Sequence, residues 1–189
     1  MTTEPITALN LPRAEPLPED IEKYYRVCEE KLGLIPNVLA AYGFSPERLR
    51  AFSGMYNQLM LADSGLSKAE REMIAVAVSA ENHCFYCLVA HGAALRELTG
   101  DAVLADTIGA NYRHAGLSTR QKAMLDFAVQ VTKASNTIEE ADREALRGAG
   151  FSNRDIWDIA EVAGFFNMTN RVASATGMRP NADYHGAAR

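Results

Sequence analysis

The 189-residue chain has no segment that alternates apolar and polar residues in the way a half-buried β-strand requires. Its apolar residues instead recur at intervals of three and four, the spacing of one face of a helix. This periodicity predicts an all-α fold. The expected helices span about residues 18–32, 46–62, 67–80, 84–98, 101–111, 118–134, 137–148 and 152–174.

Three of these helices share a starting signal. Gly-Leu-Ser at 65–67 and 116–118, and Gly-Phe-Ser at 150–152, place a serine hydroxyl where it can accept from the free N–H groups of a first turn. Three residues after each serine comes Glu70, Gln121 or Asp155, which can complete a capping box. The first two copies fit a duplicated helical unit and repeated use of a good cap equally well.

Length and composition predict a single domain. A content of 48% hydrophobic and 23% charged residues is enough for one core. Four prolines preclude a helix before residue 18, so residues 1–18 are expected to form an extended arm, followed by a helical domain over 19–176. Residues 177–189 read as a loose tail in which His185 has no specific role.

The net charge of -5 argues against nucleic acid or an anionic membrane surface as a partner, because both require clustered Lys and Arg. A small molecule or a protein is the expected partner. The first residues lack a basic region followed by an apolar run, and no apolar stretch reaches the length of a membrane span. We therefore expect a cytoplasmic protein.

The cysteines divide into two groups. Cys28 falls on the apolar face of the first expected helix and is predicted to be a core residue. Cys84 and Cys87 form a Cys-x-x-Cys motif, and in a compartment that keeps thiols reduced this motif points to chemistry rather than to a structural disulfide.

Helical geometry brings a histidine onto the face of these thiols. On a helix capped by Asn82, the residues Cys84, Cys87 and His91 are three and four apart and line one side. The unpaired N–H groups of the first turn favour a thiolate, so the pKa of at least one cysteine should be lowered. The imidazole of His91 could exchange the proton.

Glu72 lies twelve residues before Cys84, which would separate the two by about 18 Å along one continuous helix. The carboxylate can approach the thiols only if the second helix folds back beside the first, and we therefore predict a sharp break at Glu81 to His83. Single Glu residues on helices usually face solvent, and from the sequence alone we expect this for Glu72.

The segment SAENHCFYCLVAH, preceded by that glutamate, resembles the active-site signature of the alkylhydroperoxidase D and carboxymuconolactone decarboxylase superfamily, and most closely its peroxidase-related branch. The family pattern is a Glu twelve residues before the first Cys, then Cys-x-x-Cys, then a His after three residues. The chain meets it at Glu72, Cys84, Cys87 and His91. It departs from the best-known members at Tyr86, where they carry a histidine.

The resemblance implies an all-helical homo-oligomer, a trimer or a hexamer, that reduces organic hydroperoxides and is regenerated by an external dithiol or thiol protein. It implies that Cys87 attacks the peroxide, that Cys84 resolves the sulfenic acid and faces the reductant, and that Glu72 and His91 relay protons. No metal, nucleotide, flavin or haem is expected. With an unperturbed pKa near 10, Tyr86 cannot replace that histidine as a base at neutral pH. The substrate or the reductant of this chain could therefore differ from those of the best-known members.

Other interpretations compete with this one. The thiols and His91 could bind zinc with a further ligand, although no second ligand pair is visible. The cysteines could be plain core residues, the chain could be a decarboxylase-like lyase, or it could be a non-catalytic, redox-sensing helical assembly. A thioredoxin-like enzyme would need strands. On the last expected helix, Asn167, Asn170 and Arg171 are predicted to satisfy neighbouring backbone or chains rather than to frame a pocket.

Overall fold

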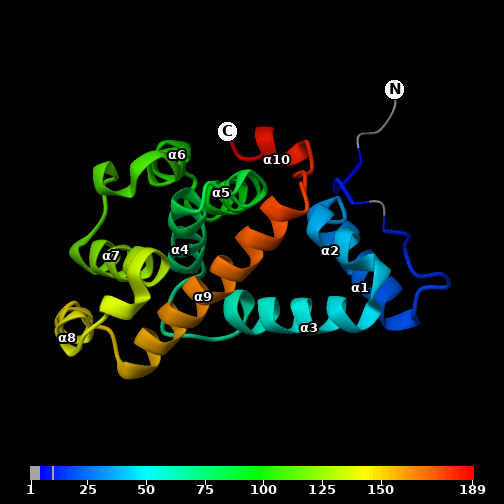
Figure 1. The fold of residues 1–189 in the computed structure, drawn as a ribbon. Helices are drawn as coiled ribbons and strands as arrows, with labels where there is room; N and C mark the ends of the chain where they lie inside the picture. The colour runs from blue at the N-terminus through cyan, green and yellow to red at the C-terminus, as the bar shows by residue number, and fades with distance from the viewer. Residues whose placement is uncertain (1–4, 10) are drawn as a thin grey trace.

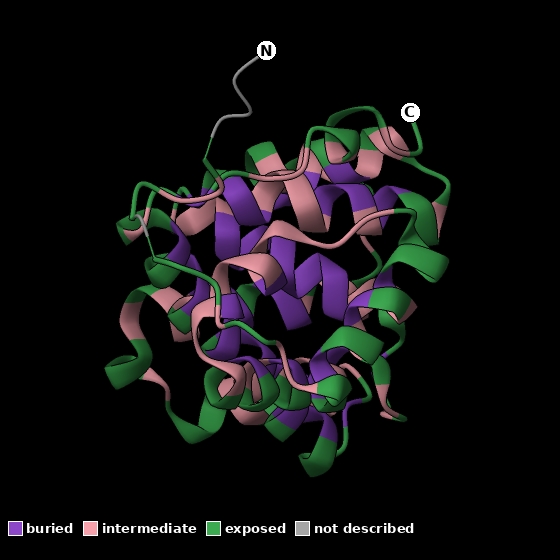
Figure 2. Cartoon of the chain, turned by 90° about the vertical axis from the view of Figure 1, so that its right-hand side faces the viewer, coloured by how far each residue is buried: buried purple, intermediate pink, exposed green. Residues whose placement is uncertain are grey.

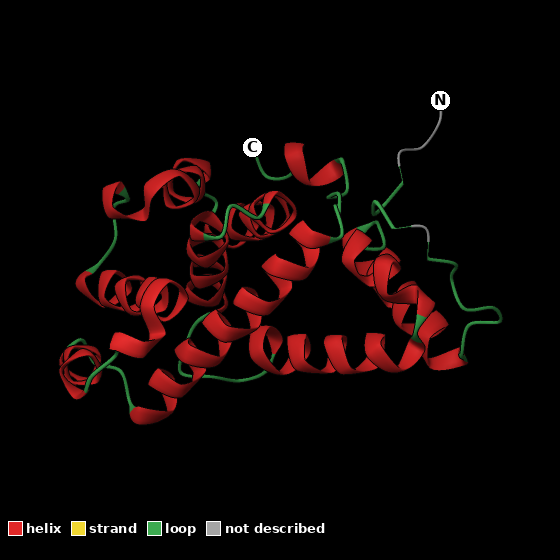
Figure 3. Ribbon diagram, viewed as in Figure 1, coloured by secondary structure: helices red, strands yellow, loops and turns green. Residues whose placement is uncertain are grey.

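The computed structural model describes residues 5–9 and 11–189. This part of the chain is all-helical, as predicted, and contains no strand (Figure 3). The α-helices are α1 (Glu19–Leu32), α2 (Asn37–Ala41), α3 (Pro46–Tyr56), α4 (Lys68–Glu81), α5 (Phe85–Thr99), α6 (Ala102–Asn111), α7 (Thr119–Ala134), α8 (Glu140–Gly148), α9 (Asn153–Ala175) and α10 (Asp183–Gly186). The 3-10 turns are η1 (Tyr42–Phe44), η3 (Tyr112–His114) and η4 (Ser135–Thr137), and η2 (Asn57–Leu61) is a π-helical turn.

All eight expected helices are confirmed, and the three capping boxes form at Ser67, Ser118 and Ser152. The short helices α2 and α10 were not predicted, because four or five residues are too few for a periodic pattern. The expected helix over 46–62 changes to π geometry in η2. The buried Arg71 of α4 donates to the carbonyls of Leu59 and Ala62 there, at 3.2 and 2.7 Å.

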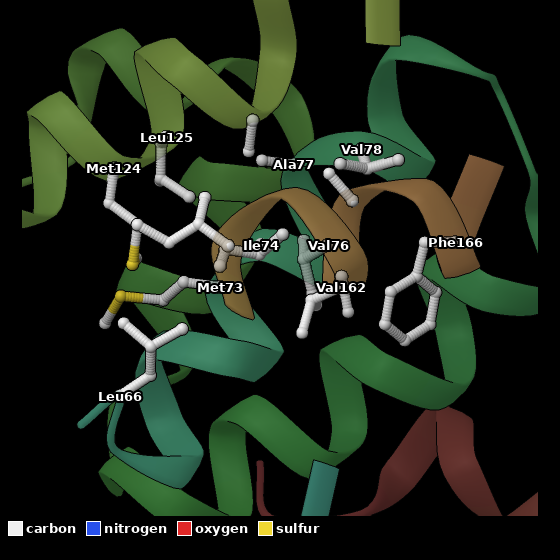
Figure 4. Close-up of a cluster of buried hydrophobic side chains, with 14 of the residues drawn as sticks. Leu66, Met73, Ile74, Val76, Ala77, Val78, Met124, Leu125, Val162 and Phe166 are labelled. Atoms are coloured by element: carbon white, nitrogen blue, oxygen red, sulfur yellow. The ribbon is translucent and has the colours of Figure 1, made fainter. Parts of the chain in front are cut away.

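Helix α4 is the central element of the larger core. It packs against α5, α6, α7 and α9, and α9 runs diagonally across the molecule (Figure 1). The buried ribbon lies at the centre of the side view in Figure 2. The largest contributions to this core come from α4, α7 and α9 and from the segment that precedes α4, and Figure 4 labels Leu66, Met73, Ile74, Val76, Ala77, Val78, Met124, Leu125, Val162 and Phe166.

A smaller core holds α1, α2 and α3 together. It is built from Ile21, Tyr25, Cys28, Leu39 and Leu49, and the Tyr25 hydroxyl donates to the Leu39 carbonyl at 3.0 Å. Cys28 is 8% exposed, which confirms its prediction as a core residue. Burial raises the pKa of its thiol, so this cysteine is a packing residue.

The arm before α1 has no helix among its described residues, and part of it lies against the chain's other end. The Ala8 N–H donates to the Thr176 carbonyl at 2.8 Å, and the Arg179 N–H donates to the Ile6 carbonyl at 2.9 Å. Among the described residues, no helix combines the length and apolarity needed to cross a membrane.

Candidate active site

The predicted break between the two site helices is confirmed. Helix α4 ends at Glu81, and His83 adopts a left-handed conformation with φ 51°. The N–H of Cys84 then donates back to the Ser79 carbonyl at 3.0 Å, the six-residue closure typical of a helix C-terminus. Asn82 was expected to cap the second helix, and this was wrong: Asn82 is the C-cap of α4, and Cys84 is the N-cap of α5.

The reversal packs α5 against α4 and brings the carboxylate to the imidazole. Glu72 Oε2 and His91 Nδ1 are 2.7 Å apart, with side chains 7% and 13% exposed. The expectation of a solvent-facing Glu72 was wrong. The face of α4 on which Glu72 lies is covered by α5, and that packing depends on the turn at 82–84 rather than on the local sequence around Glu72.

Aromatic rings surround this acid and imidazole pair. The Phe166 ring meets the His91 ring edge to face, at 4.6 Å between centroids, and Tyr56 lies 6.5 Å from His91. Burial raises the pKa of Tyr56 well above its ordinary value, and the Glu72 charge adds to the effect, so the phenol stays neutral. The pair therefore lies in a poorly hydrated environment, which strengthens its electrostatic interaction.

The two thiols lie next to each other beneath the first turn of α5. Both cysteines are free and buried, with 1% exposure for Cys84 and 3% for Cys87. The Cys87 thiol hydrogen-bonds to Cys84 and lowers the pKa of Cys84 to about 6, with help from the Cys87 N–H, Ser174 and the His91 charge, against burial. The same interaction raises the pKa of Cys87, because its proton is held by the neighbouring thiolate. The predicted lowering of a cysteine pKa falls on Cys84, but its main cause is the Cys87 thiol rather than the N–H groups of the first turn.

A buried polar network lies behind Cys87. Asn170 is fully buried and donates to the Ser79 hydroxyl at 3.0 Å, while the Asn82 side chain donates to the side-chain oxygen Oδ1 of Asn170 at 3.0 Å. The Cys84 thiol and burial raise the pKa of Cys87, and Asn170 and Ser79 oppose this rise as donors toward its sulfur. These residues form contacts within the chain, between α4, α5 and α9, and the network is the second layer of the site.

The outer part of the network joins a third helix. Asn167 accepts from Asn82 at 3.1 Å and donates to Thr132 of α7 at 3.0 Å, and Arg171 donates to the Asn167 carbonyl at 2.7 Å. Asn167 and Arg171 therefore satisfy neighbouring backbone and side chains, as predicted. Asn170, in contrast, contacts a site thiol, a role that the sequence reasoning did not give it.

Tyr86 occupies the position where the best-known relatives carry a histidine. It is 4% exposed, and its hydroxyl accepts from the Val38 N–H at 3.0 Å. Burial raises the pKa of the phenol, which remains protonated. Tyr86 therefore fastens α2 to the N-terminus of α5, a structural function that a shorter imidazole at this position would not reproduce in the same way.

Cys84 opens onto a pocket of about 710 Å³ between α5, the end of α9 and the two ends of the chain. Its wall includes both apolar groups and imidazoles, among them Phe85, Met178, His83 and His185. Cys87 does not line it.

The expectation of a loose tail was wrong. The buried Arg96 of α5 donates to the carbonyls of Tyr184 and Ala187, at 2.8 and 2.9 Å, and holds α10 against α5. His185 consequently lines the pocket, with its ring 6.0 Å from the Phe85 ring. The composition of the tail gave no indication of this docking, because its partner is a single arginine far away in the sequence.

Within the described residues no group of three or more His, Cys, Asp or Glu side chains is arranged to hold a metal ion. Ser79 and Arg96 are site residues that the sequence reasoning missed. A signal existed for Ser79, since it is the one hydroxyl in the apolar run of residues 73–80 that forms the second half of α4. A polar group at such a position requires a buried partner.

The fold and this constellation of residues define the class of protein. Residues 46–102 match the carboxymuconolactone decarboxylase family. The chain is 63% identical to an uncharacterized peroxidase-related protein from Silicibacter sp. TM1040, whose crystal structure superposes with a TM-score of 0.96 over 100% of both chains. This chain therefore belongs to the alkylhydroperoxidase D and carboxymuconolactone decarboxylase superfamily, in its peroxidase-related branch.

Two further structures are similar. One is an uncharacterized peroxidase-related protein from Ralstonia eutropha JMP134, described as an alkylhydroperoxidase AhpD core. It is 45% identical to this chain, with a TM-score of 0.95 over 99% of this chain and 98% of that one. The debrominase Bmp8 is 17% identical, with a TM-score of 0.77 over 100% of this chain and 98% of its own, and shares the fold. No curated protein matches the chain significantly.

Proposed function

We propose that the protein is a thiol-dependent alkylhydroperoxide reductase. The observation that carries the proposal is the pairing of the Cys84 and Cys87 thiols next to a buried acid and imidazole. His91 lies one turn after Cys87 on α5, and its ring is 2.7 Å from the Glu72 carboxylate of α4. A lowered thiol pKa provides the nucleophile, and a buried acid and imidazole pair provides proton transfer. Membership of the peroxidase-related branch supports the same chemistry.

The reaction has three steps. A thiolate attacks the terminal oxygen of the hydroperoxide, the O–O bond breaks, and the alkoxide takes a proton from the relay and leaves as an alcohol, so that the cysteine becomes a sulfenic acid. The second thiol displaces water and closes the Cys84–Cys87 disulfide. An external dithiol then reduces the disulfide and is itself oxidised.

The order of the thiols is the finer part of the proposal. We assign the peroxide to Cys87, as the family resemblance implies, because His91 follows it by one turn and two donors favour its thiolate. The proton on Cys87 can pass to Cys84 along their hydrogen bond. Cys84, which lines the pocket, faces the reductant. The lower pKa of Cys84 favours the opposite order, and sulfenic acid trapping distinguishes the two.

The test is a thiol titration. One equivalent of cumene hydroperoxide should remove two of the three thiols, and dihydrolipoamide should restore them. Cys28→Ser should leave this loss of two thiols unchanged. With dimedone, Cys84→Ser should accumulate a sulfenic acid adduct at Cys87; an adduct confined to Cys84 in Cys87→Ser would reverse the order. A lyase or a passive scaffold would lose no thiols to the peroxide.

The remaining parts of the proposal concern the surroundings of the enzyme. We propose a cytoplasmic homo-oligomer, a trimer or a hexamer, with an organic hydroperoxide as substrate and a dithiol or thiol protein as reductant. The apolar side chains exposed on α9, Trp157 at 64% and Met168 at 50%, support association. Sedimentation equilibrium tests the assembly, and a monomer at working concentration would contradict it.

A further inference from the structure

We propose that Ser79 and Asn170 form a binding site for the thiolate of Cys87, and that this site receives the negative charge when the disulfide is reduced. The inference rests on the proposed function for its place in the cycle, while the site itself is a property of the folded chain. Neither residue belongs to the family's Cys, His and Glu signature, and one comes from α4 while the other comes from α9.

The hydrogen bonds of the network run in one direction. The Asn82 side chain donates to Oδ1 of Asn170 at 3.0 Å, and the Asn170 side-chain N–H in turn donates to Oγ of Ser79 at 3.0 Å. With its oxygen accepting from Asn170, the Ser79 hydroxyl has its proton free. The Ser79 carbonyl accepts from the Cys84 N–H at 3.0 Å, which holds Ser79 at the start of the Cys-x-x-Cys segment. Both Ser79 and Asn170 act as donors that lower the pKa of Cys87. Each hydrogen bond in such a chain polarises the next donor, so the donors that face Cys87 carry an increased partial positive charge.

The burial of these groups makes the arrangement specific. Ser79 and Asn170 are both 0% exposed, so the sulfur receives hydrogen bonds from fixed donors in place of water. Preorganised donors in a poorly hydrated site stabilise a developing anion without reorganising at the moment of reaction. A neutral thiol, which is a weak acceptor, gains much less from the same donors.

The chemistry of disulfide reduction needs such a site at Cys87. Of the two cysteines, Cys84 lines the pocket and Cys87 does not. The thiolate of an external dithiol attacks the Cys84 sulfur, a bond forms between these two sulfurs, and the Cys84–Cys87 bond breaks with its electron pair on Cys87. Disulfide exchange is faster when the leaving thiol has a lower pKa. Ser79 and Asn170 would thus accelerate the regeneration of the enzyme.

The test measures the thiolate directly and requires no peroxidase activity. In a Cys84→Ser background, the rate of Cys87 alkylation by iodoacetamide is followed against pH by peptide mass spectrometry, which separates Cys87 from Cys28. Ser79→Ala and Asn170→Asp should each move the midpoint upward by about one pH unit or more, because one removes a donor and the other replaces it with a carboxylate.

The charged and titratable groups around Cys87 remain constant in this comparison: Glu72 of α4, and Tyr86 and His91 of α5. Thr132→Val, which removes only the outer end of the network, should not move the midpoint. Melting curves verify that each variant is folded. If Asn170→Asp does not fold, Ser79→Ala alone still tests the proposal. An unchanged midpoint in folded Ser79→Ala would overturn the proposal.

A second measurement places the site in the cycle. With both cysteines present and oxidised, reduction by dithiothreitol should slow by about two- to threefold for each unit by which the Cys87 pKa rises. A shifted midpoint with an unchanged reduction rate would mean that dithiols attack Cys87, contradicting the assigned direction of exchange. Absence of peroxide turnover would sink the proposed function but leave both measurements interpretable.

Discussion

The carboxylate of Glu72 is shielded from water and contacts the imidazole of His91 at 2.7 Å. An acid in this position can orient the ring and share its proton, and general acid and base catalysis typically accounts for a rate factor of about 100 or more. Glu72→Gln should therefore slow the oxidation of the thiols by peroxide by about 100-fold with the fold retained. Stopped-flow thiol oxidation measures the effect.

Glu81→Gln is the matched control, because Glu81 lies on the same helix and forms an ion pair with Lys133 of α7, at 3.0 Å, instead of contacting His91. It should react at the wild-type rate. If Glu72→Gln and Glu81→Gln were oxidised by peroxide at equal rates, Glu72 would have only a packing role.

The lowered pKa of Cys84 makes the stability of the reduced protein depend on pH. Its folded-state pKa is about 6, against an ordinary value of 9.0, so its contribution is fully present above pH 9 and is lost as the pH falls through 6. The melting temperature of the reduced protein should fall across this window relative to that of the disulfide form, in which neither thiol titrates. Parallel curves for the two redox states between pH 9 and 6 would be the contrary result.

At the scale of single residues, the sequence allowed Cys84, Cys87 and His91 to be placed on one helix face, because their spacing is local. It did not reveal the burial of Glu72, the contact of Asn170 with Cys87 or the position of His185 at the pocket. Each of these depends on which distant helix or segment packs against the residue, and a single sequence contains no record of that packing.

Among the elements, the turn at 82–84 determines the site, because it reverses the chain between α4 and α5. His83 holds a left-handed conformation there, a position at which glycine is favoured. A left-handed residue with a Cβ costs about 1–2 kcal/mol. His83→Gly should therefore raise the free energy of unfolding by about 1 kcal/mol, as measured by urea denaturation.

His83→Ala separates the conformational effect from the loss of the imidazole, since alanine retains the Cβ. It should give no comparable gain. If both substitutions stabilise the protein equally, the left-handed strain is not the cause.

A buried guanidinium, that of Arg96, attaches the C-terminal helix α10 to α5. Arg96→Ala would leave the carbonyls of Tyr184 and Ala187 without this donor, and α10 should separate from α5. Cys84 should then react several-fold faster with a bulky disulfide reagent such as Ellman's reagent. Arg143→Ala, on the exposed surface of α8, is the control and should keep the wild-type rate.

The starts of three helices were the part of the fold most accessible from sequence. The serine and acid or amide pairs at Ser67, Ser118 and Ser152 mark helix starts by a local mechanism, and each cap forms as expected. The π-helical turn η2 could not be foreseen, because it depends on Arg71 reaching the carbonyls of an earlier segment.

For the whole molecule, Phe52 connects the two cores. Its ring stacks on Tyr42 at 4.8 Å and approaches Phe165 of α9 at 5.6 Å. Phe52→Ala should lower the free energy of unfolding by about 2–4 kcal/mol. Amide exchange should accelerate more in α1 and α2 than in α4, whereas Val103→Ala, at a side chain 76% exposed, should change neither quantity. Uniform acceleration throughout the chain would show that the two cores unfold together.

The arm and the tail meet beside the pocket through two backbone hydrogen bonds, between Ala8 and Thr176 and between Arg179 and Ile6. Pro5 and Ile6 line that pocket together with residues 177–180. A purification handle or fluorescent fusion joined at the N-terminus would therefore be tethered only a few residues from Cys84. Kinetic comparisons between preparations should use protein from which such additions have been cleaved, since an appended sequence would compete with the proposed dithiol reductant for the opening beside Cys84.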